Sequence, residues 1–206
     1  MRERKQMTDF DAHCLSDLSP DEEQALKAYK AASWPSGSGT SSPCFDMNRE
    51  LRNGLQPREI DPQLRGIVDA LDRMFVRCPR LSREVVVHRA IGTRLHLPVH
   101  EVGKRFRSLE FWSTATSDAR VDSFLTPISN KNNRGAILDL TLPAGVPAYN
   151  METFPDFGGH EAELLLPRGI LWTVDHFVMI PHDELSPPVQ RDFENVARVA
   201  LTATSW

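Results

Sequence analysis

The hydrophobic periodicity changes near residue 80, and this change restricts the fold more than any other feature of the sequence. Before it, apolar residues recur at helical spacing and predict a helix over 62–77 with one continuous apolar face: Leu64, Ile67, Val68, Leu71 and Phe75. After it, apolar runs are short and β-branched, as in EVVVHRAI at 84–91, which predicts a strand. Helices followed by strands indicate an α+β fold rather than an alternating α/β fold.

Two shorter helices are expected before this one. Ser19-Pro20-Asp21-Glu22 combines an N-cap serine, a first-turn proline and a capping-box glutamate, which predicts a helix over 19–33. A second short helix is expected over 45–52. Because the helices alone would leave apolar faces exposed, we expect them to pack on the strands in a single domain over 19–206. Residues 1–18 are polar, and we expect a flexible N-terminal segment.

The second half of the chain is predicted to be mostly strands, at 109–115, 136–142, 162–167 and 171–180. Between them we expect three other segments: a short helix over 99–106, a helical turn within 117–125 and a loop over 127–135. Apolar residues at helical spacing predict a last helix over 187–204: Val189, Phe193, Val196, Ala197 and Ala200. We expect residues 181–206 to be a C-terminal extension that packs on the domain or binds a partner.

Composition excludes several classes of protein. The net charge of −4 argues against general binding to nucleic acid or to anionic membranes. No apolar run reaches the ~18 residues needed to cross a bilayer, and the basic N-terminus lacks the apolar core of a cleavable signal peptide. Cys14, Cys44 and Cys78 are odd in number and far apart, which indicates reduced thiols. We expect a monomer acting in a cytosol, and secretion without a cleaved signal stays open.

The stretch GGHEAELLLPRG (158–169) places two carboxylates on one side of a predicted strand. Side chains alternate faces along a strand, so Glu161 and Glu163 point the same way, roughly 6–7 Å apart at their Cα atoms. Like charges this close repel and gain nothing for folding, although a Glu-x-Glu pair is most often a solvated strand face. His160-Glu161 begins like a zinc-protease HExxH motif, but Leu164 replaces the second histidine.

Two further elements precede this pair. Arg89 ends the apolar strand VVVHRAIG, where a guanidinium needs an anionic partner, either a structural salt bridge or a ligand. Ser113-Thr114 follows the aromatic segment LEFW, where a serine–threonine pair is most often a turn. Each element alone is weak evidence for a functional site.

Together, and in this order, the three elements resemble the mono-ADP-ribosyltransferase family in its Arg–Ser–Glu class, typified by bacterial toxins and effectors. SPDEEQALKAY (19–29), FDMNRELRNG (45–54) and LPRG (166–169) are also similar to that family's segments. The resemblance covers about residues 19–180. It implies N-terminal helices packed on a two-sheet, largely antiparallel β core, NAD as co-substrate and no metal.

The resemblance also implies roles for these residues. Glu163 stabilises the positive charge that develops on the ribose when the bond to nicotinamide breaks. Ser113, with Thr114 in the NAD-binding set, orients Glu163, and Arg89 binds a pyrophosphate or ribose oxygen. We expect the remaining NAD contacts from four positions: Ala90, Gly92, Phe124 stacking on nicotinamide, and Arg134 near a phosphate.

Glu161 is expected to act on the acceptor. An acceptor guanidinium stays protonated at ordinary pH, so a second carboxylate can bind it and help to remove its proton. In the family, Glu at this position accompanies arginine acceptors, which implies transfer to an arginine of a target protein. Phe154 and Phe157, in the loop METFPDFGGH (151–160), are expected to contact that target or to pack locally.

The sequence departs from the family pattern at two positions, and alternatives to the expected activity stay open. Ala115 stands where a serine is usual, and His88 stands where an aromatic residue is usual. The alternatives are an enzyme that hydrolyses NAD, a transferase with a non-arginine acceptor, and a non-catalytic binding module on the same fold. By analogy with the family, the protein is expected to be a secreted or translocated effector.

Overall fold

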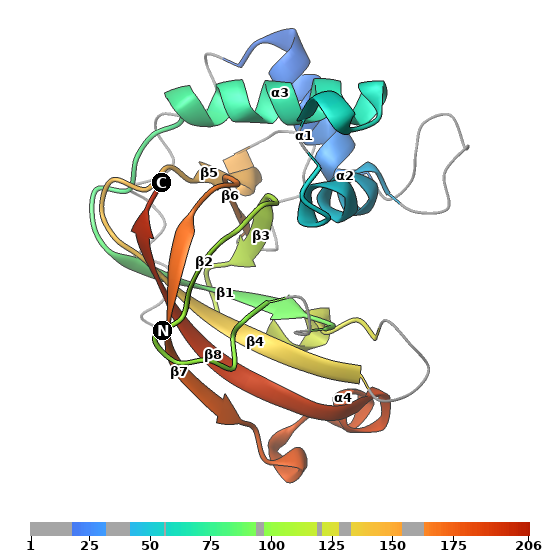
Figure 1. Ribbon diagram of the computed structural model, residues 1–206, viewed down its shortest axis with the longest axis vertical. Coiled ribbons are helices and arrows are strands. Elements are labelled where there is room, and N and C mark those ends of the chain that lie inside the picture. Colours follow the sequence, from blue (N-terminus) through green and yellow to red (C-terminus); the bar gives the residue numbers. More distant parts are fainter. Residues whose placement is uncertain are drawn as a thin grey trace.

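The computed structural model describes residues 18–31, 42–55, 57–93, 97–118, 121–127, 133–153 and 163–206. In this part of the chain the helices α1 (Pro20–Lys30), α2 (Pro43–Arg52) and α3 (Pro62–Arg77) gather at one end of the molecule, above the strands (Figure 1). The mixed α+β architecture is as expected from the sequence. The expected flexible segment 1–18 lies outside the described residues, apart from Leu18.

The helices begin where their capping residues predict. In α1 the Ser19 hydroxyl accepts from the Glu22 amide at 3.3 Å, and Glu22 Oε2 accepts from the Ser19 amide at 2.8 Å, which completes the capping box. Burial alone would raise the pKa of Glu22, but hydrogen bonds from Arg77 of α3 and from Ser19 outweigh it and hold this pKa below its ordinary value. The capping box therefore also joins α1 to α3.

The strands of the described chain form one eight-stranded sheet in the order β2-β7-β8-β4-β1-β3-β6-β5. All neighbours are antiparallel except β4 and β8. The bounds of the strands are β1 (Val85–Ile91), β2 (Arg105–Arg107), β3 (Trp112–Ala115), β4 (Asn133–Leu142), β5 (Tyr149–Asn150), β6 (Glu163–Leu166), β7 (Leu171–Met179) and β8 (Phe193–Ser205).

The expected division into two sheets is not confirmed, because β1 and β3 are joined by the pair His88 and Ala115 into one series. The series bends strongly. In a flat sheet β3 and β7 would be separated by four strand spacings, roughly 19 Å. Yet Trp112 of β3 stacks on Trp172 of β7 with ring centroids 5.2 Å apart. The strands therefore fold over a shared apolar core.

The last strand corrects the sequence analysis. Residues 187–204 are not one helix: α4 (Pro187–Asp192) ends at Asp192, and β8 lies inside the sheet between β7 and β4. From Ala197 onward the buried residues of β8 alternate with more exposed ones, and the alternating buried set is Ala197, Val199, Leu201 and Ala203. This period of two overrides the helical spacing of the same segment. The expected C-terminal extension is therefore an inner strand.

Smaller segments also differ from expectation. The helix expected over 99–106 is wrong, because turns there lead into the edge strand β2. The loop expected over 127–135 ends earlier, since β4 begins at Asn133. The helical turn within 117–125 is confirmed as the short 3-10 helix η3 (Val121–Phe124).

The turn at LPRG fixes the sheet to the helices. Gly169 has φ +89°, in the left-handed region that favours glycine, and its amide donates to the Ser108 carbonyl at 2.6 Å. Arg168 then donates from Nε to both carboxylate oxygens of Asp72 on α3, at 2.9 and 3.0 Å. The apolar faces of α1–α3 bury one core cluster together with residues of the sheet region: Phe111, Tyr149 and Leu165. No helix in the described ranges is both long and apolar enough to span a bilayer.

Candidate active site

Arg89, Ser113 and Glu163 come from three strands, β1, β3 and β6, and lie in one chain of contacts. Arg89 Nη1 donates to the Ser113 carbonyl oxygen at 2.7 Å. Ser113 Oγ donates to Glu163 Oε1 at 2.6 Å. The residues that the sequence analysis singled out are therefore brought together, with Ser113 between the guanidinium and the carboxylate.

The strand register explains this placement. Ser113 lies opposite Leu165, so Glu163, two residues earlier on β6, is its diagonal neighbour on the same face. Ala115 lies directly opposite Glu163 and also pairs with His88 of β1. The alanine that replaces the usual serine therefore lies across from Glu163.

Glu163 is 6% exposed, and both of its carboxylate oxygens are bonded. Ser113 holds Oε1, and the ammonium of Lys30, the last residue of α1, forms an ion pair with Oε2. The sequence analysis missed Lys30. No local signal separates it from an ordinary basic residue at the C-terminal end of a helix.

The Arg89 side chain contacts other residues of the protein through its guanidinium, but its Nε–H donor has no acceptor among the described residues. Its guanidinium carbon lies 5.7 Å from the centroid of the Trp112 ring, within cation–π range. Its Nε is buried and has no acceptor among the described residues. A buried donor without a partner is rare in folded proteins, and it suits a ligand oxygen.

Arg89, Ser113 and Glu163 border a cleft of about 120 Å³. Several residues predicted to bind the cofactor also line it: Ala90, Thr114 and Phe124. The Phe124 side chain is 53% exposed on η3, so its ring is available to a ligand. The Thr114 hydroxyl donates to the Leu164 carbonyl at 2.8 Å, which gives Thr114 a structural contact as well.

Two other predicted residues, Arg134 and Gly92, are not among the described residues that line this cleft. Arg134, at the start of β4, pairs with Glu194 at 3.4 Å and is not among the lining residues. Gly92 follows β1 in a bend and is not among them either. Glu161, Phe154 and Phe157 lie outside the described residues. The roles assigned to all of these residues stay predictions.

Residues of α1 and α2 fix the helices to the start of β3. The Tyr29 hydroxyl and the Asn48 side-chain amide both donate to the Phe111 carbonyl, at 3.4 and 3.2 Å. Burial raises the pKa of Tyr29 well above its ordinary value and the pKa of the Cys44 thiol to about 11, so both groups stay neutral at physiological pH. Tyr29 and Asn48 lie in the segments SPDEEQALKAY and FDMNRELRNG, which carry part of the family resemblance but were given no place in the site.

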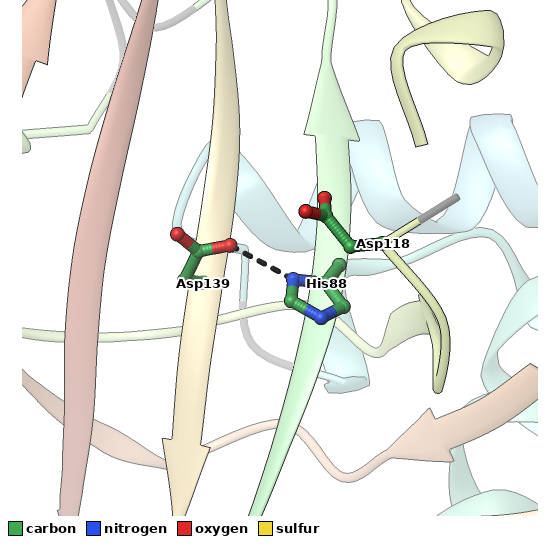
Figure 2. A group of neighbouring side chains, drawn as sticks. All are labelled: His88, Asp118 and Asp139. Atoms are coloured by element: carbon green, nitrogen blue, oxygen red, sulfur yellow. Dashed lines mark hydrogen bonds and ion pairs between the residues drawn. The ribbon is translucent and has the colours of Figure 1, made fainter. Parts of the chain in front are cut away.

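His88 belongs to a second cluster, shown in Figure 2, beside the same cleft. Its Nδ1 lies 2.8 Å from Asp139 Oδ1 of β4, and Asp118 lies close by. Among the described residues, His88, Asp118 and Asp139 have the spacing of metal ligands. Arg198 of β8, however, donates to Asp139 at 2.7 and 2.9 Å and to Asp118 at 2.9 Å. The Arg198 guanidinium therefore already supplies a positive charge to these two carboxylates. The expected lack of a metal stays a prediction.

Contacts within this cluster lower the pKa of Asp139. Burial alone would raise the pKa of Asp139, but hydrogen bonds from His88 and Arg198 outweigh burial and hold that pKa below its ordinary value. Arg198 joins β8 and β4 to Asp118, which leads into η3 and Phe124. Phe124, the aromatic residue that lines the cleft, is thereby connected to the sheet.

A family model described as ADP-ribosyltransferase exoenzyme matches residues 11–191. The sequence has no significant match among curated proteins.

Solved structures with similar folds include the following three proteins. One is Plx2a, an ADP-ribosyltransferase toxin from Paenibacillus larvae, with 16% identity and a TM-score of 0.67 over 96% of this chain and 92% of that chain. Exoenzyme S from Pseudomonas aeruginosa, in complex with human 14-3-3 protein beta and bound to carba-NAD, has 18% identity and a TM-score of 0.60 over 90% and 74%. ADP-ribosyltransferase Vis in complex with agmatine has 13% identity and a TM-score of 0.64 over 96% and 80%. At these identities the likeness shows the fold alone.

The family match extends over most of the chain and includes the strands that carry Arg89, Ser113 and Glu163. The chain therefore belongs to the ADP-ribosyltransferase exoenzyme family.

Proposed function

We propose that the protein transfers ADP-ribose from NAD to an arginine side chain of a target protein and releases nicotinamide. The observation that carries this proposal is the chain of contacts from Arg89 through Ser113 to Glu163. A guanidinium, a hydroxyl and a carboxylate from three strands meet at one cleft. No step of this reaction requires a metal.

Glu163 is suited to the bond-breaking step. Cleavage of a glycosidic bond passes through an oxocarbenium-like transition state with positive charge on the sugar. A carboxylate fixed on a strand and held by Ser113 stabilises that charge without reorganising during the reaction. The nicotinamide ring of NAD is positively charged while it is bound to the ribose and becomes neutral when it leaves. The leaving group therefore needs no proton donor.

The walls of the cleft suit the rest of the dinucleotide. Arg89 keeps a buried Nε–H without an acceptor among the described residues, and a ribose or pyrophosphate oxygen would satisfy it. Phe124 offers an exposed ring for stacking on nicotinamide. Ala90 lines the cleft beside Arg89, where backbone groups can bond the nicotinamide amide.

The assignment of arginine as the acceptor depends on Glu161. We assign this residue to the acceptor side, where its carboxylate binds the guanidinium and helps to remove its proton. The relative Vis was solved with agmatine, a guanidinium compound, which supports a guanidinium acceptor for this fold. Phe154 and Phe157 are proposed to contact the target protein. The proteins of known structure with this fold include bacterial toxins, and we extend to this chain the role of an effector delivered into a host cytosol.

The test is incubation with labelled NAD and a cell lysate, followed by mass spectrometry of the modified residue. We expect label on arginine, lost in Glu163→Gln, while Glu161→Gln loses transfer to protein and keeps part of the NAD cleavage. Label on a different residue type would overturn the arginine assignment. NAD cleavage without labelled protein would indicate a hydrolase, and no NAD binding by calorimetry would indicate a binding module.

A further inference from the structure

The Glu163 carboxylate has a partner that the reaction described above does not use. Lys30 Nζ forms an ion pair with Oε2, while Ser113 holds Oε1. We propose that Lys30 is a positioning residue, whose ammonium fixes the orientation and the charge of the Glu163 carboxylate for NAD cleavage. This inference rests on the proposed function of the site and adds a residue to it.

The packing of α1 holds Lys30 in place. The N-terminal end of the helix is closed by the capping box and by the contact of Glu22 with Arg77 of α3. Near its C-terminal end, the Tyr29 hydroxyl donates to the Phe111 carbonyl, just before β3. Lys30 follows Tyr29 as the last helical residue, with its side chain 26% exposed. The helix is therefore anchored at both ends, and Lys30 extends from it toward β6.

Lys30 also bears on the charge of the Glu163 carboxylate. A carboxylate that is 6% exposed is costly to keep ionised unless a cation or hydrogen-bond donors lie beside it. Arg89 lies nearby, but its Nη1 is bonded to the Ser113 carbonyl. Tyr29 and Cys44 also lie near Glu163, and burial raises the pKa of each, so neither contributes charge. Among the described residues, Lys30 is the cation in direct contact with this carboxylate.

Ser113 and Lys30 together set the orientation of the Glu163 carboxylate. A carboxylate oxygen has two lone pairs, so one bond to Ser113 and one to Lys30 leave acceptor capacity on both oxygens. The two bonds hold the group from both ends, and the remaining lone pairs stay available to the ribose hydroxyl. A reactive group held from two sides needs less reordering when substrate binds. Loss of Lys30 should therefore slow the reaction more than it weakens NAD binding.

The test measures steady-state NAD cleavage by Lys30→Met, Lys30→Arg and, as a matched control, Lys27→Met. Lys27 is exposed in the same last turn of α1, so its replacement removes the same charge from the same helix. We expect Lys30→Met to lower kcat on the order of 10- to 100-fold, the effect of losing one hydrogen bond to a charged group, with little change in KM. Lys30→Arg should retain most of the wild-type kcat, and Lys27→Met should match wild type.

A second measurement does not depend on turnover. NMR of glutamate carboxyl carbons, assigned with Glu163→Gln, should show a changed chemical shift for Glu163 in Lys30→Met and an unchanged one in Lys27→Met, because only the first variant loses the ion pair with Oε2. Thermal unfolding of each variant separates a folding defect from a local one. A kcat in Lys30→Met equal to or above wild type, or equal losses in the Met and Arg variants, would overturn the proposal. Absence of NAD cleavage by the wild-type protein would instead overturn the proposed function.

Discussion

Replacing Ser113 with alanine removes the hydroxyl that holds Glu163, and we expect kcat for NAD cleavage to fall on the order of 10- to 100-fold. The lost bond is 2.6 Å long, partly buried and made to a carboxylate. Hydrogen bonds to charged groups contribute roughly 1.5–3 kcal/mol, and every 1.4 kcal/mol or so corresponds to a factor of ten in rate. Arg89 donates to the backbone carbonyl of Ser113, which alanine retains, so this contact should persist.

The assay is release of nicotinamide from NAD, with NAD affinity measured separately by calorimetry. Ser108→Ala is the matched control, because it deletes the same atom from a buried serine whose hydroxyl donates to the Ile170 carbonyl, away from the cleft. We expect Ser108→Ala to keep the wild-type kcat. A kcat of Ser113→Ala within about twofold of wild type would refute the reasoning, because a bond worth less than ~0.5 kcal/mol cannot orient a catalytic group.

Three further predictions concern the fold. Gly135→Ala should lower the free energy of unfolding by about 1–3 kcal/mol, because the new Cβ would lie 2.9 Å from Phe193 Cε1, and an unchanged urea midpoint would contradict this. The pKa values of Glu22 and Asp139 are held low in the folded state, so the stability they contribute is present above about pH 4 and is lost as pH falls through their lowered values; the Glu22→Gln, Asp139→Asn double variant should lose less stability on acidification than wild type. Val199→Asp, at a fully buried position of β8, should prevent folding as judged by circular dichroism, and a native-like spectrum would contradict the inner-strand assignment.

The residues at the centre of the site could be predicted because their chemistry is distinctive. An arginine in an apolar strand, a hydroxyl pair and two glutamates two positions apart are each weak evidence alone, but their combination in this order along the chain resembles a known family. The structure brings Arg89, Ser113 and Glu163 together as expected. The helices α1 and α3 were equally predictable, since a proline at the first turn and a capping residue mark the start of each.

The errors have physical causes. In β8 the segment ARVALTAT satisfies a period of two as well as the helical spacing, and only its place between β4 and β7 decides between them. The single sheet depends on one residue pair between β1 and β3, which no local pattern encodes. Lys30 reaches Glu163 across 133 positions of sequence, and a basic residue at a helix end is ordinary in itself.

We propose above all that Glu163, held beside Arg89 and Ser113, stabilises the transition state in which the bond between ribose and nicotinamide breaks. The most direct measurement compares nicotinamide release by wild type and by Glu163→Gln, which keeps the shape of the side chain and removes its charge, with NAD affinity measured on the same samples. We expect a loss of at least about 100-fold in kcat with NAD affinity close to wild type, since the charge acts on the transition state. Equal rates in the two proteins would contradict the account.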